Sequence, residues 1–485
     1  MTLALLLSFG MALCFVIRGA SLAAPLAYTS ASWRDLWTVE GTVDRGRYLA
    51  LGFALMAFKY NLERVVAGLL FHRSWSVLAH YVHAPQLDPQ ALHGTDARFY
   101  GMMTVMTLPF IWSGVALTVR RLRSAGLPPA LAVLFFAPYL NLLFFLTLSA
   151  LPAIEDGSTS HSPFFDRLIP ESEVGAAVGT AALGGAVVLL MAQFSSVLMR
   201  GYGWGLFLGL PFVLGLTSAL VYGHHKPRTM NECLGVALLS VSVGGVVLFA
   251  AAVEGVICLA MAAPLAVVLA GMGAIIGYFI QKRHRPARHA ATLIVLLLGL
   301  PVLMGAESIE GIHEPVLPVV STVDIDAPAA AVWRNVVSFS ELPKPTHWIF
   351  QLGFAYPTRA TIIGRGVGAV RHCEFTTGPF VEPITVWDEP RLLKFSVTSQ
   401  PSPMKESSWY PDLHPAHLDD YLVSKGGEFR LEPLPGGRTR LTGTTWYSHS
   451  IRPSWYWRPM SDWIIHRIHE RVLAHVKMLS EARST

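Results

Sequence analysis

GAVRHCEFTTGPFVEPITVWDEPRLLKFSV, residues 368–397, is the stretch that decides the fold of the C-terminal part of this chain. Apolar and polar residues alternate along it, and the turn signals Gly378-Pro379 and Glu389-Pro390 interrupt the alternation, which is typical of strands joined by tight turns. Because successive side chains of a strand point to opposite faces, His372 and Glu374 share one face and Arg371 and Cys373 share the other. The alternation does not indicate which of these faces points inward.

The strand pattern continues on both sides of this stretch, and helices flank it. An alternating run at 319–326 ends at Ala327-Pro328, and a helix with one apolar side is expected over 329–339. Further strands are expected at residues 359–363, 367–376, 380–388, 391–399, 427–433 and 439–448. A final helix is expected over about 459–482, because its apolar residues recur three or four positions apart.

The order of these elements resembles the superfamily of START, Bet v 1 and polyketide cyclase/dehydrase-like (SRPBCC) proteins. The matching segments are Val323-Asp-Ile325-Asp-Ala327-Pro328 with Val332-Trp333, Gly366-x-Gly368 before a strand, and Val386-Trp387-Asp388-Glu389-Pro390-Arg391-Leu392-Leu393-Lys394-Phe395. The resemblance covers residues 316–482 and implies an α+β helix-grip domain, in which an antiparallel sheet bends around the long C-terminal helix. It also implies a cavity between sheet and helix that holds a lipid or another hydrophobic small molecule.

Seven residues are candidates for binding that ligand, and each of the aromatic ones has core filling as its alternative role. They are Trp348, Phe350, His372, Glu374, Phe395, Trp446 and Tyr447. His372 beside Glu374 also has the chemistry of a general acid or base. The spacings His414/His417 and His466/His469 suit two metal ligands but come without a third, so no metal or other cofactor is predicted. No catalytic residue is assigned, and the sequence leaves open whether the domain is an enzyme.

The N-terminal part has a different composition, and it dominates the average of the whole chain. Of all 485 residues 52% are hydrophobic and only 14% charged, which excludes an ordinary soluble enzyme and a disordered chain. Apolar runs long enough to span a bilayer lie near residues 47–71, 102–119, 128–150, 174–197, 203–222, 233–253, 256–280 and 289–305. A shorter run at 2–17 is either a further helix or a signal peptide. We therefore predict a polytopic α-helical membrane domain of about 8–9 helices over 1–306, and a polar linker over 307–315.

Two motifs between residues 33 and 152 resemble a bacterial inner-membrane family called domain of unknown function 805. They are Trp37-Thr-Val-Glu-Gly41-Thr-Val-Asp-Arg45-Gly-Arg47-Tyr48 and Arg120-Arg121-Leu122-Arg123-Ser124-Ala125-Gly126-Leu127. The second motif departs from the family's Arg-Arg-Leu-His-Asp at Arg123 and Ser124. The resemblance implies an integral membrane protein and brings no activity. The arginines themselves suit a helix C-terminus, as a topology anchor or a contact to lipid phosphates.

Charge placement predicts the location of the chain. Basic runs are short and flank apolar segments, so they indicate membrane boundaries and not a nucleic-acid face. Counting spans with the positive-inside rule places the C-terminal domain in the cytoplasm, beside a membrane that we expect to be the bacterial inner membrane. Lys59, Glu63 and Glu254 are ionisable groups in or near the spans, and they suit a transport path. The alternative is an ion pair between Lys59 and Glu63, which are four residues apart, and a turn at the membrane interface for Glu254.

These observations lead to three hypotheses. The first is a membrane-anchored binding protein whose START-like domain holds a lipid or other hydrophobic small molecule at the membrane surface, for lipid sensing or transfer. The alternative is an enzyme of polyketide cyclase/dehydrase type acting in the same cavity. The third is a transporter. Membrane lipid and a hydrophobic ligand are the expected partners, nucleic acid is not, and the sequence does not indicate the oligomeric state.

Overall fold

A computed structural model of the chain describes residues 36–73, 75, 95–136, 140–151, 169–199, 201–283, 289–309, 316–410, 413, 415–418 and 421–482. It divides into two compact units. The helical unit comprises residues 1–194, 204–247 and 264–310. The C-terminal unit comprises residues 195–203, 248–263 and 311–485, so it includes the turn after one long apolar helix and the beginning of the next. The run at 2–17 lies outside the described residues.

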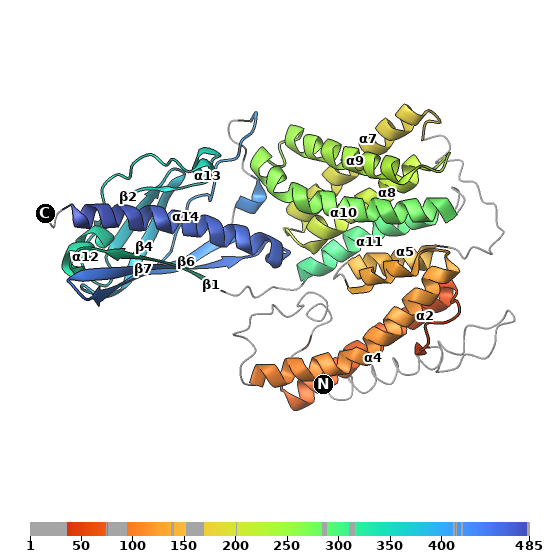
Figure 1. The fold of residues 1–485 in the computed structure, drawn as a ribbon, viewed down its shortest axis with the longest axis horizontal. Helices are drawn as coiled ribbons and strands as arrows, with labels where there is room; N and C mark the ends of the chain where they lie inside the picture. The colour runs from red at the N-terminus through yellow and green to blue at the C-terminus, as the bar shows by residue number, and fades with distance from the viewer. Residues whose placement is uncertain are drawn as a thin grey trace. The chain divides into compact units, whose positions relative to one another are not determined.

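The helical unit is built from apolar helices (Figure 1). Its elements are α2 (Arg45–Leu70), α4 (Thr95–Ser124), η2 (Pro129–Phe136), α5 (Leu140–Ala150), α7 (Glu173–Gln193), η3 (Phe194–Leu198), η4 (Gly205–Gly209), α8 (Leu210–Tyr222), α9 (Met230–Ala250), α10 (Val256–Arg283) and α11 (His289–Ile309). The last residues of α9, the first of α10 and most of η3 belong to the C-terminal unit.

Five helices in the described part of the chain are long and apolar enough to cross a membrane. They are Arg98–Ser124, Glu173–Leu198, Gly205–Tyr222, Met230–Ala250 and Val256–Lys282. The expected span 128–150 instead forms η2 and the eleven-residue α5. The expected span 47–71 forms α2, which carries Lys59, Glu63 and Arg64.

Small residues let two of these helices approach closely. A Cβ atom on Gly215 of α8 would lie 1.9 Å from the carbonyl oxygen of Ala270 in α10, which is far inside van der Waals contact. Only glycine fits at this crossing, as expected for helices that pack through small residues in a membrane.

Ionisable groups in the helical unit find partners inside it. Lys59 and Glu63 form an ion pair at 2.6 Å, and Glu63 also accepts hydrogen bonds from Trp75 and Thr107. Arg121 is fully buried, and its guanidinium donates to the backbone carbonyls of Leu148 and Leu151 at the end of α5. The contacts of Lys59 and Glu63 favour a structural ion pair over an ion path for these two groups.

The C-terminal unit contains a seven-stranded antiparallel sheet with the order β1-β7-β6-β5-β4-β3-β2. Its strands are β1 (Leu317–Ile325), β2 (Pro357–Ile363), β3 (Val370–Phe375), β4 (Gly378–Asp388), β5 (Leu392–Ser396), β6 (Leu422–Leu434) and β7 (Arg438–His449). Its helices are α12 (Ala329–Val337), α13 (Trp348–Gln351), η6 (Ala416–Leu418) and α14 (Ser454–Glu481).

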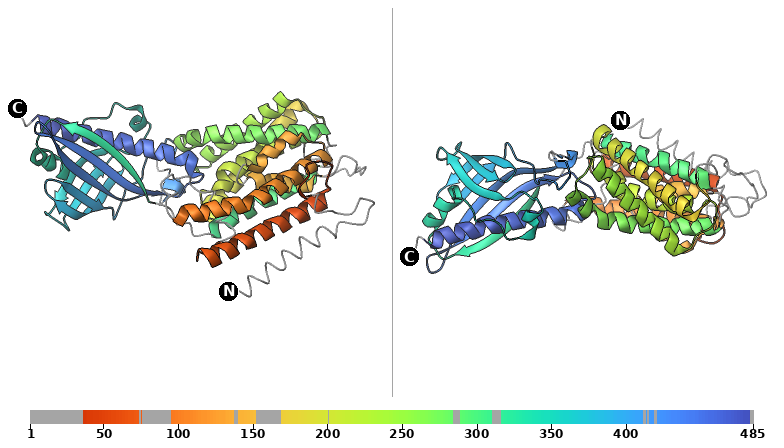
Figure 2. Two further views of the ribbon diagram at one scale, coloured as in Figure 1. Left: turned by 60° about the horizontal axis from the view of Figure 1, so that its bottom comes forward. Right: turned by 90° about the horizontal axis from the view of Figure 1, so that it is seen from above.

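The sheet forms a half-barrel, and the long helix α14 runs along its concave side (Figure 2). Val332, Trp333 and Val336 of α12 are buried, as their apolar spacing predicts. They share one core with Leu393 and Leu441 from the sheet and with Val472 and Val476 from α14. The predicted helix-grip fold of the C-terminal domain is confirmed.

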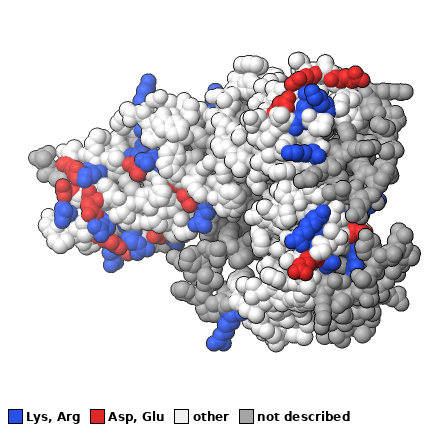
Figure 3. All heavy atoms as spheres, turned by 45° about the vertical axis from the view of Figure 1, so that its right-hand side comes forward, with Lys and Arg blue, Asp and Glu red and all other residues white. Residues whose placement is uncertain are grey.

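The surface of this domain carries charges of both signs. On the face drawn in Figure 3, acidic and basic side chains are interspersed over the sheet and its turns. Arg440 with Asp324 and Arg365 with Glu389 are examples of exposed pairs. Such a mixture is typical of an ordinary solvated surface.

Candidate functional site

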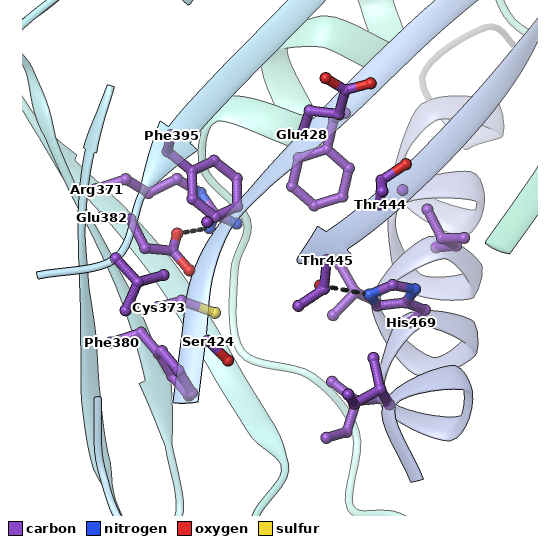
Figure 4. A pocket seen from close by; sticks show the side chains of 18 of the residues that line it. Arg371, Cys373, Phe380, Glu382, Phe395, Ser424, Glu428, Thr444, Thr445 and His469 are labelled. Carbon is purple, nitrogen blue, oxygen red and sulfur yellow. Dashed lines mark hydrogen bonds and ion pairs between the residues drawn. The ribbon is translucent and has the colours of Figure 1, made fainter. Parts of the chain in front are cut away.

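A cavity lies between the concave face of the sheet and α14 (Figure 4). Its volume is about 120 Å³. Strands β3 to β7 and helix α14 supply its walls, through Arg371, Cys373, Phe375, Phe380, Glu382, Phe395, Val397, Ser424, Gly426, Glu428, Phe429, Gly443, Thr444, Thr445, Ile465, Ile468, His469, Val472 and Leu473. The position follows from the fold, because a strongly bent sheet leaves space that the helix side chains do not fill.

The walls are mostly apolar. Phe375, Phe380, Phe395 and Phe429 come from the sheet, and aliphatic side chains of α14 close the opposite side. Gly443 lies at the centre of β7, where a Cβ atom would make only ordinary contacts of 3.5–3.7 Å with Phe429 and Leu473. Larger side chains at position 443 would therefore fill the cavity without a clash at Cβ.

One buried ion pair provides the strongest polar feature of the site. Arg371 of β3 and Glu382 of β4 face each other in register, and Arg371 donates a hydrogen bond to the carboxylate. Both are buried, with 2% and 8% of their side chains exposed. Burial raises the pKa of the Glu382 carboxyl, and the adjacent guanidinium of Arg371 opposes that rise.

Aromatic rings complete the surroundings of Arg371. The guanidinium carbon lies 5.5–5.6 Å from the ring centres of Phe339, Phe395 and Phe429, within the range of a cation–π contact. Within the described residues its Nε has no hydrogen-bond partner. A buried donor without a partner is costly, so a polar atom of a bound ligand would be stabilised here.

His469 of α14 is the polar group on the opposite wall. Its Nε2 lies 2.7 Å from the hydroxyl of Thr445, and its Nδ1 lies 3.1 Å from the hydroxyl of Ser321 (Figure 4 shows the Thr445 contact). Burial, with a smaller contribution from His466, lowers the pKa of His469 to about 4. The imidazole is therefore neutral at pH 7, with both nitrogens held by hydroxyl groups.

Cys373 lines the cavity but is not activated. Burial, together with the nearby Glu382, raises the pKa of its thiol to about 12. Because the thiolate is the nucleophilic form, Cys373 packs as a small apolar side chain at neutral pH.

The structure places the seven sequence-predicted residues in different surroundings. Among the described residues that line the cavity, Phe395 is the one member of that set. Trp348 is 57% exposed on α13, and Phe350 packs in a second apolar cluster with Ile257 and Met404. His372 and Glu374 are half-buried on the face of β3 opposite to Arg371 and Cys373.

The last two predicted residues lie near the end of β7. Trp446 is covered by Lys394, whose Nζ lies 4.7 Å from the ring centre. Tyr447 is fully buried and donates a hydrogen bond of 2.5 Å to Asp462 of α14. Tyr447 therefore ties the sheet to the helix, and its position corresponds to the core-filling alternative.

Sequence reasoning did not single out Arg371 or Glu382 as site residues, and it considered His469 only as a metal ligand together with His466. The available signal was the alternation that puts Arg371 and Cys373 on one face, combined with a second strand that carries Glu382 among apolar residues. His466 and His469 share one partner, since both Nδ1 atoms lie within 3.1 Å of the Ser321 hydroxyl. His414 lies outside the described residues.

A comparison with protein-family models supports the assignment of the domain. Residues 317–455 match the family described as polyketide cyclase / dehydrase and lipid transport. The match supports the polyketide cyclase/dehydrase-like part of the predicted resemblance for the C-terminal domain. Nothing in these comparisons supports the resemblance of residues 33–152 to domain of unknown function 805.

Solved structures of low sequence identity also match this part of the chain. A norcoclaurine synthase point mutant from Thalictrum flavum is 14% identical, covers 36% of this chain and 99% of its own, and gives a TM-score of 0.25. The Zhui aromatase/cyclase from a Streptomyces species is 17% identical, covers 35% and 97%, and gives a TM-score of 0.23. No curated protein matches the chain.

Proposed function

We propose that this chain is a membrane-anchored protein whose C-terminal domain binds a hydrophobic small molecule in the cavity between the sheet and α14. The observation that carries the proposal is the apolar cavity with one buried polar pair, Arg371–Glu382, in its wall. The five apolar helices support membrane anchoring, and the predicted cytoplasmic side and bacterial inner membrane belong to the same proposal. The resemblance of residues 33–152 to domain of unknown function 805 is also part of this proposal.

The cavity volume limits what enters it. A cavity of about 150 Å³ in another protein accommodates benzene, and typical drug-sized pockets are about 300–1,000 Å³. The 120 Å³ present here therefore fits one ring or the end of a chain, and not a whole lipid. We expect a ligand whose apolar end contacts the phenylalanines and whose polar atom meets Nε of Arg371.

A cyclase- or dehydratase-type enzyme is the second candidate, because polar groups occupy opposite walls. Glu382, Glu428 and the neutral imidazole of His469 line the cavity and are able to take or give a proton. His372 and Glu374, the pair suggested by the sequence, lie on the other face of β3 and are not proposed for this role.

Native mass spectrometry of the full-length chain, purified in mild detergent, tests the binding function. We expect a reproducible bound mass that is released on unfolding and identified by chromatography and fragmentation. Extraction of the membrane fraction with alkaline carbonate tests the anchoring, and an anchored chain remains in the pellet.

The variant Gly443→Leu sharpens this experiment. The leucine side chain occupies the cavity, so the bound mass should disappear while the chain stays folded. Thr361→Leu is the matched control, because Thr361 is exposed on β2 away from the cavity. Equal ligand occupancy in both variants would place the bound molecule elsewhere and overturn the proposal.

A further inference from the structure

A cluster of side chains with metal-ligating atoms lies in the C-terminal unit, apart from the cavity-lining residues. It consists of Glu254, in the turn before α10, Cys258, in the first turn of α10, and His417, in η6 of the loop between β5 and β6. One donor atom from each residue lies within 4.8 Å of the other two. All three residues belong to one compact unit.

The imidazole of His417 lies between the other two groups. Its Nε2 is 2.8 Å from Sγ of Cys258, and its Nδ1 is 3.3 Å from Oε2 of Glu254. Tyr202 fixes the carboxylate, because its hydroxyl donates a 3.1 Å hydrogen bond to the other oxygen, Oε1. The ring of Tyr202 also packs edge-on against the imidazole at 5.2 Å.

Two buried atoms of this cluster have no hydrogen-bond partner among the described residues. They are Nδ1 of His417 and Oε2 of Glu254, which face each other without the geometry of a hydrogen bond. The side chain of His417 is only 9% exposed, so water gives it little compensation. A buried polar atom without a partner is costly, and a cation between these two atoms would remove the cost for both.

The charge of the surroundings also favours a cation. Glu406 lies beside Cys258, where its carboxylate accepts the backbone N–H groups of Ile257 and Cys258 at 3.1 Å each. This approach depends on Gly255, because a Cβ atom there would lie 2.1 Å from Oε2 of Glu406. Among the described residues, no lysine or arginine forms an ion pair with Glu254 or Glu406. The cluster and the adjacent Glu406 thus bring two carboxylates, a thiol and an imidazole together, with no such ion pair to a lysine or arginine among the described residues.

From this combination we infer that Glu254, Cys258 and His417 form a binding site for a divalent, borderline-soft cation, with Zn²⁺ as the best fit. Zinc takes sulfur, nitrogen and oxygen ligands at about 2.0–2.3 Å, and a tetrahedral ion holds its donors about 3.3–3.6 Å apart. The donor atoms now lie within 4.8 Å of one another, so side-chain rotations that bring the farthest pair closer by roughly 1 Å are sufficient for tetrahedral coordination. Three protein ligands leave a fourth position for water, and Tyr202 orients the carboxylate from outside the shell.

The bound ion would hold the loop between β5 and β6 against the first turn of α10. Apolar contacts already join these segments, since Ile257 and Leu418 lie in one cluster with Phe350 and Met404. The metal site adds a contact whose strength depends on ion concentration, because a ligand that binds only the folded state stabilises that state.

Metal analysis of the full-length chain in detergent tests this inference. After incubation with Zn²⁺ and removal of free ion, we expect one equivalent of zinc per chain by mass spectrometry of the metal. Cys258→Ser and His417→Asn should each lower zinc affinity at least 100-fold, and Glu254→Gln about 10-fold. Cys233→Ser is the matched control, because it removes a buried thiol of α9 in the helical unit and should leave zinc binding unchanged.

Two further measurements separate a metal site from a hydrogen-bonded cluster. Cobalt(II) in place of zinc should give the thiolate-to-cobalt absorption band, and Cys258→Ser should abolish it. His417→Cys supplies another zinc ligand and should retain the ion, whereas His417→Asn, which restores only hydrogen bonding, should not. Absence of zinc from the unmodified chain, equal zinc in all variants, or cobalt binding without the thiolate band would each overturn the inference.

Discussion

Two fully buried arginines show how the two units of this chain differ. Arg121 in the helical unit donates to the backbone carbonyl oxygens of Leu148 and Leu151 at the end of α5. Arg371 in the C-terminal domain is paired with the carboxylate of Glu382 beside a cavity, and its Nε has no partner among the described residues. Arg121 therefore joins helices, whereas Arg371 gives a binding cavity its polar group.

Arg371→Met should produce the largest effect on stability. It leaves the buried carboxylate of Glu382 without its cation, which costs about 3–5 kcal/mol. Thermal unfolding of the detergent-solubilised chain, followed by tryptophan fluorescence, should show a lower Tm for the C-terminal unit. The double variant Arg371→Met/Glu382→Leu should recover most of the loss, because no unpaired charge remains. A double variant as unstable as the single one would contradict the role of the charge.

Lowering the pH should cause the next-largest loss of stability, in the C-terminal unit. Burial lowers the pKa of His469 and of His449 from 6.5 to about 4 in the folded chain. Between pH 6.5 and 4 the unfolded chain therefore binds protons that the folded chain does not, so stability falls as the pH falls. Each histidine should contribute about 3 kcal/mol to the loss at pH 4. His469→Gln should make Tm depend less steeply on pH. An unchanged dependence of Tm on pH in this variant would contradict the explanation.

Arg121→Met should have a smaller effect than Arg371→Met. It removes the donor to the carbonyl oxygens of Leu148 and Leu151, so the expected cost is about 1–3 kcal/mol. Circular dichroism of the helical signal during heating measures it. If Arg121→Met costs more than Arg371→Met, the proposed difference between the two arginines is wrong. Arg123→Met is a suitable control, because Arg123 is exposed at the same helix end.

Thr445→Val should have the smallest effect and reports on the cavity wall. It removes the hydroxyl that contacts Nε2 of His469, at a cost of about 1 kcal/mol. Thr442→Val removes a half-buried hydroxyl of β7 that contacts Thr322 and does not line the cavity, and it should change the Tm less. Titration of His469 by nuclear magnetic resonance should show a changed pKa in Thr445→Val and an unchanged one in Thr442→Val.

The candidate site was only partly accessible to sequence reasoning. Phe395 was predicted and lines the cavity, whereas Trp348 lies exposed and Tyr447 connects the sheet to α14. The preference for His372 and Glu374 rested on their polarity, with no information on which face of β3 is concave. A lone buried guanidinium is costly, so the sequence offers no reason to place Arg371 on the inward face. Glu382 removes that objection, but the two residues become neighbours only when β3 and β4 pair in register.

The sequence by itself determined the local patterns: alternation and turn residues specify the strands, periodic apolar residues specify α12 and α14, and long apolar runs specify the helices of the N-terminal part. These patterns depend on neighbours along the chain. Only the tertiary structure decided which face of the sheet encloses the cavity, that Arg371 meets Glu382, and that Glu254 and Cys258 meet His417 about 160 residues away. These contacts depend on strand register, sheet curvature and loop path, which no local pattern of residues encodes.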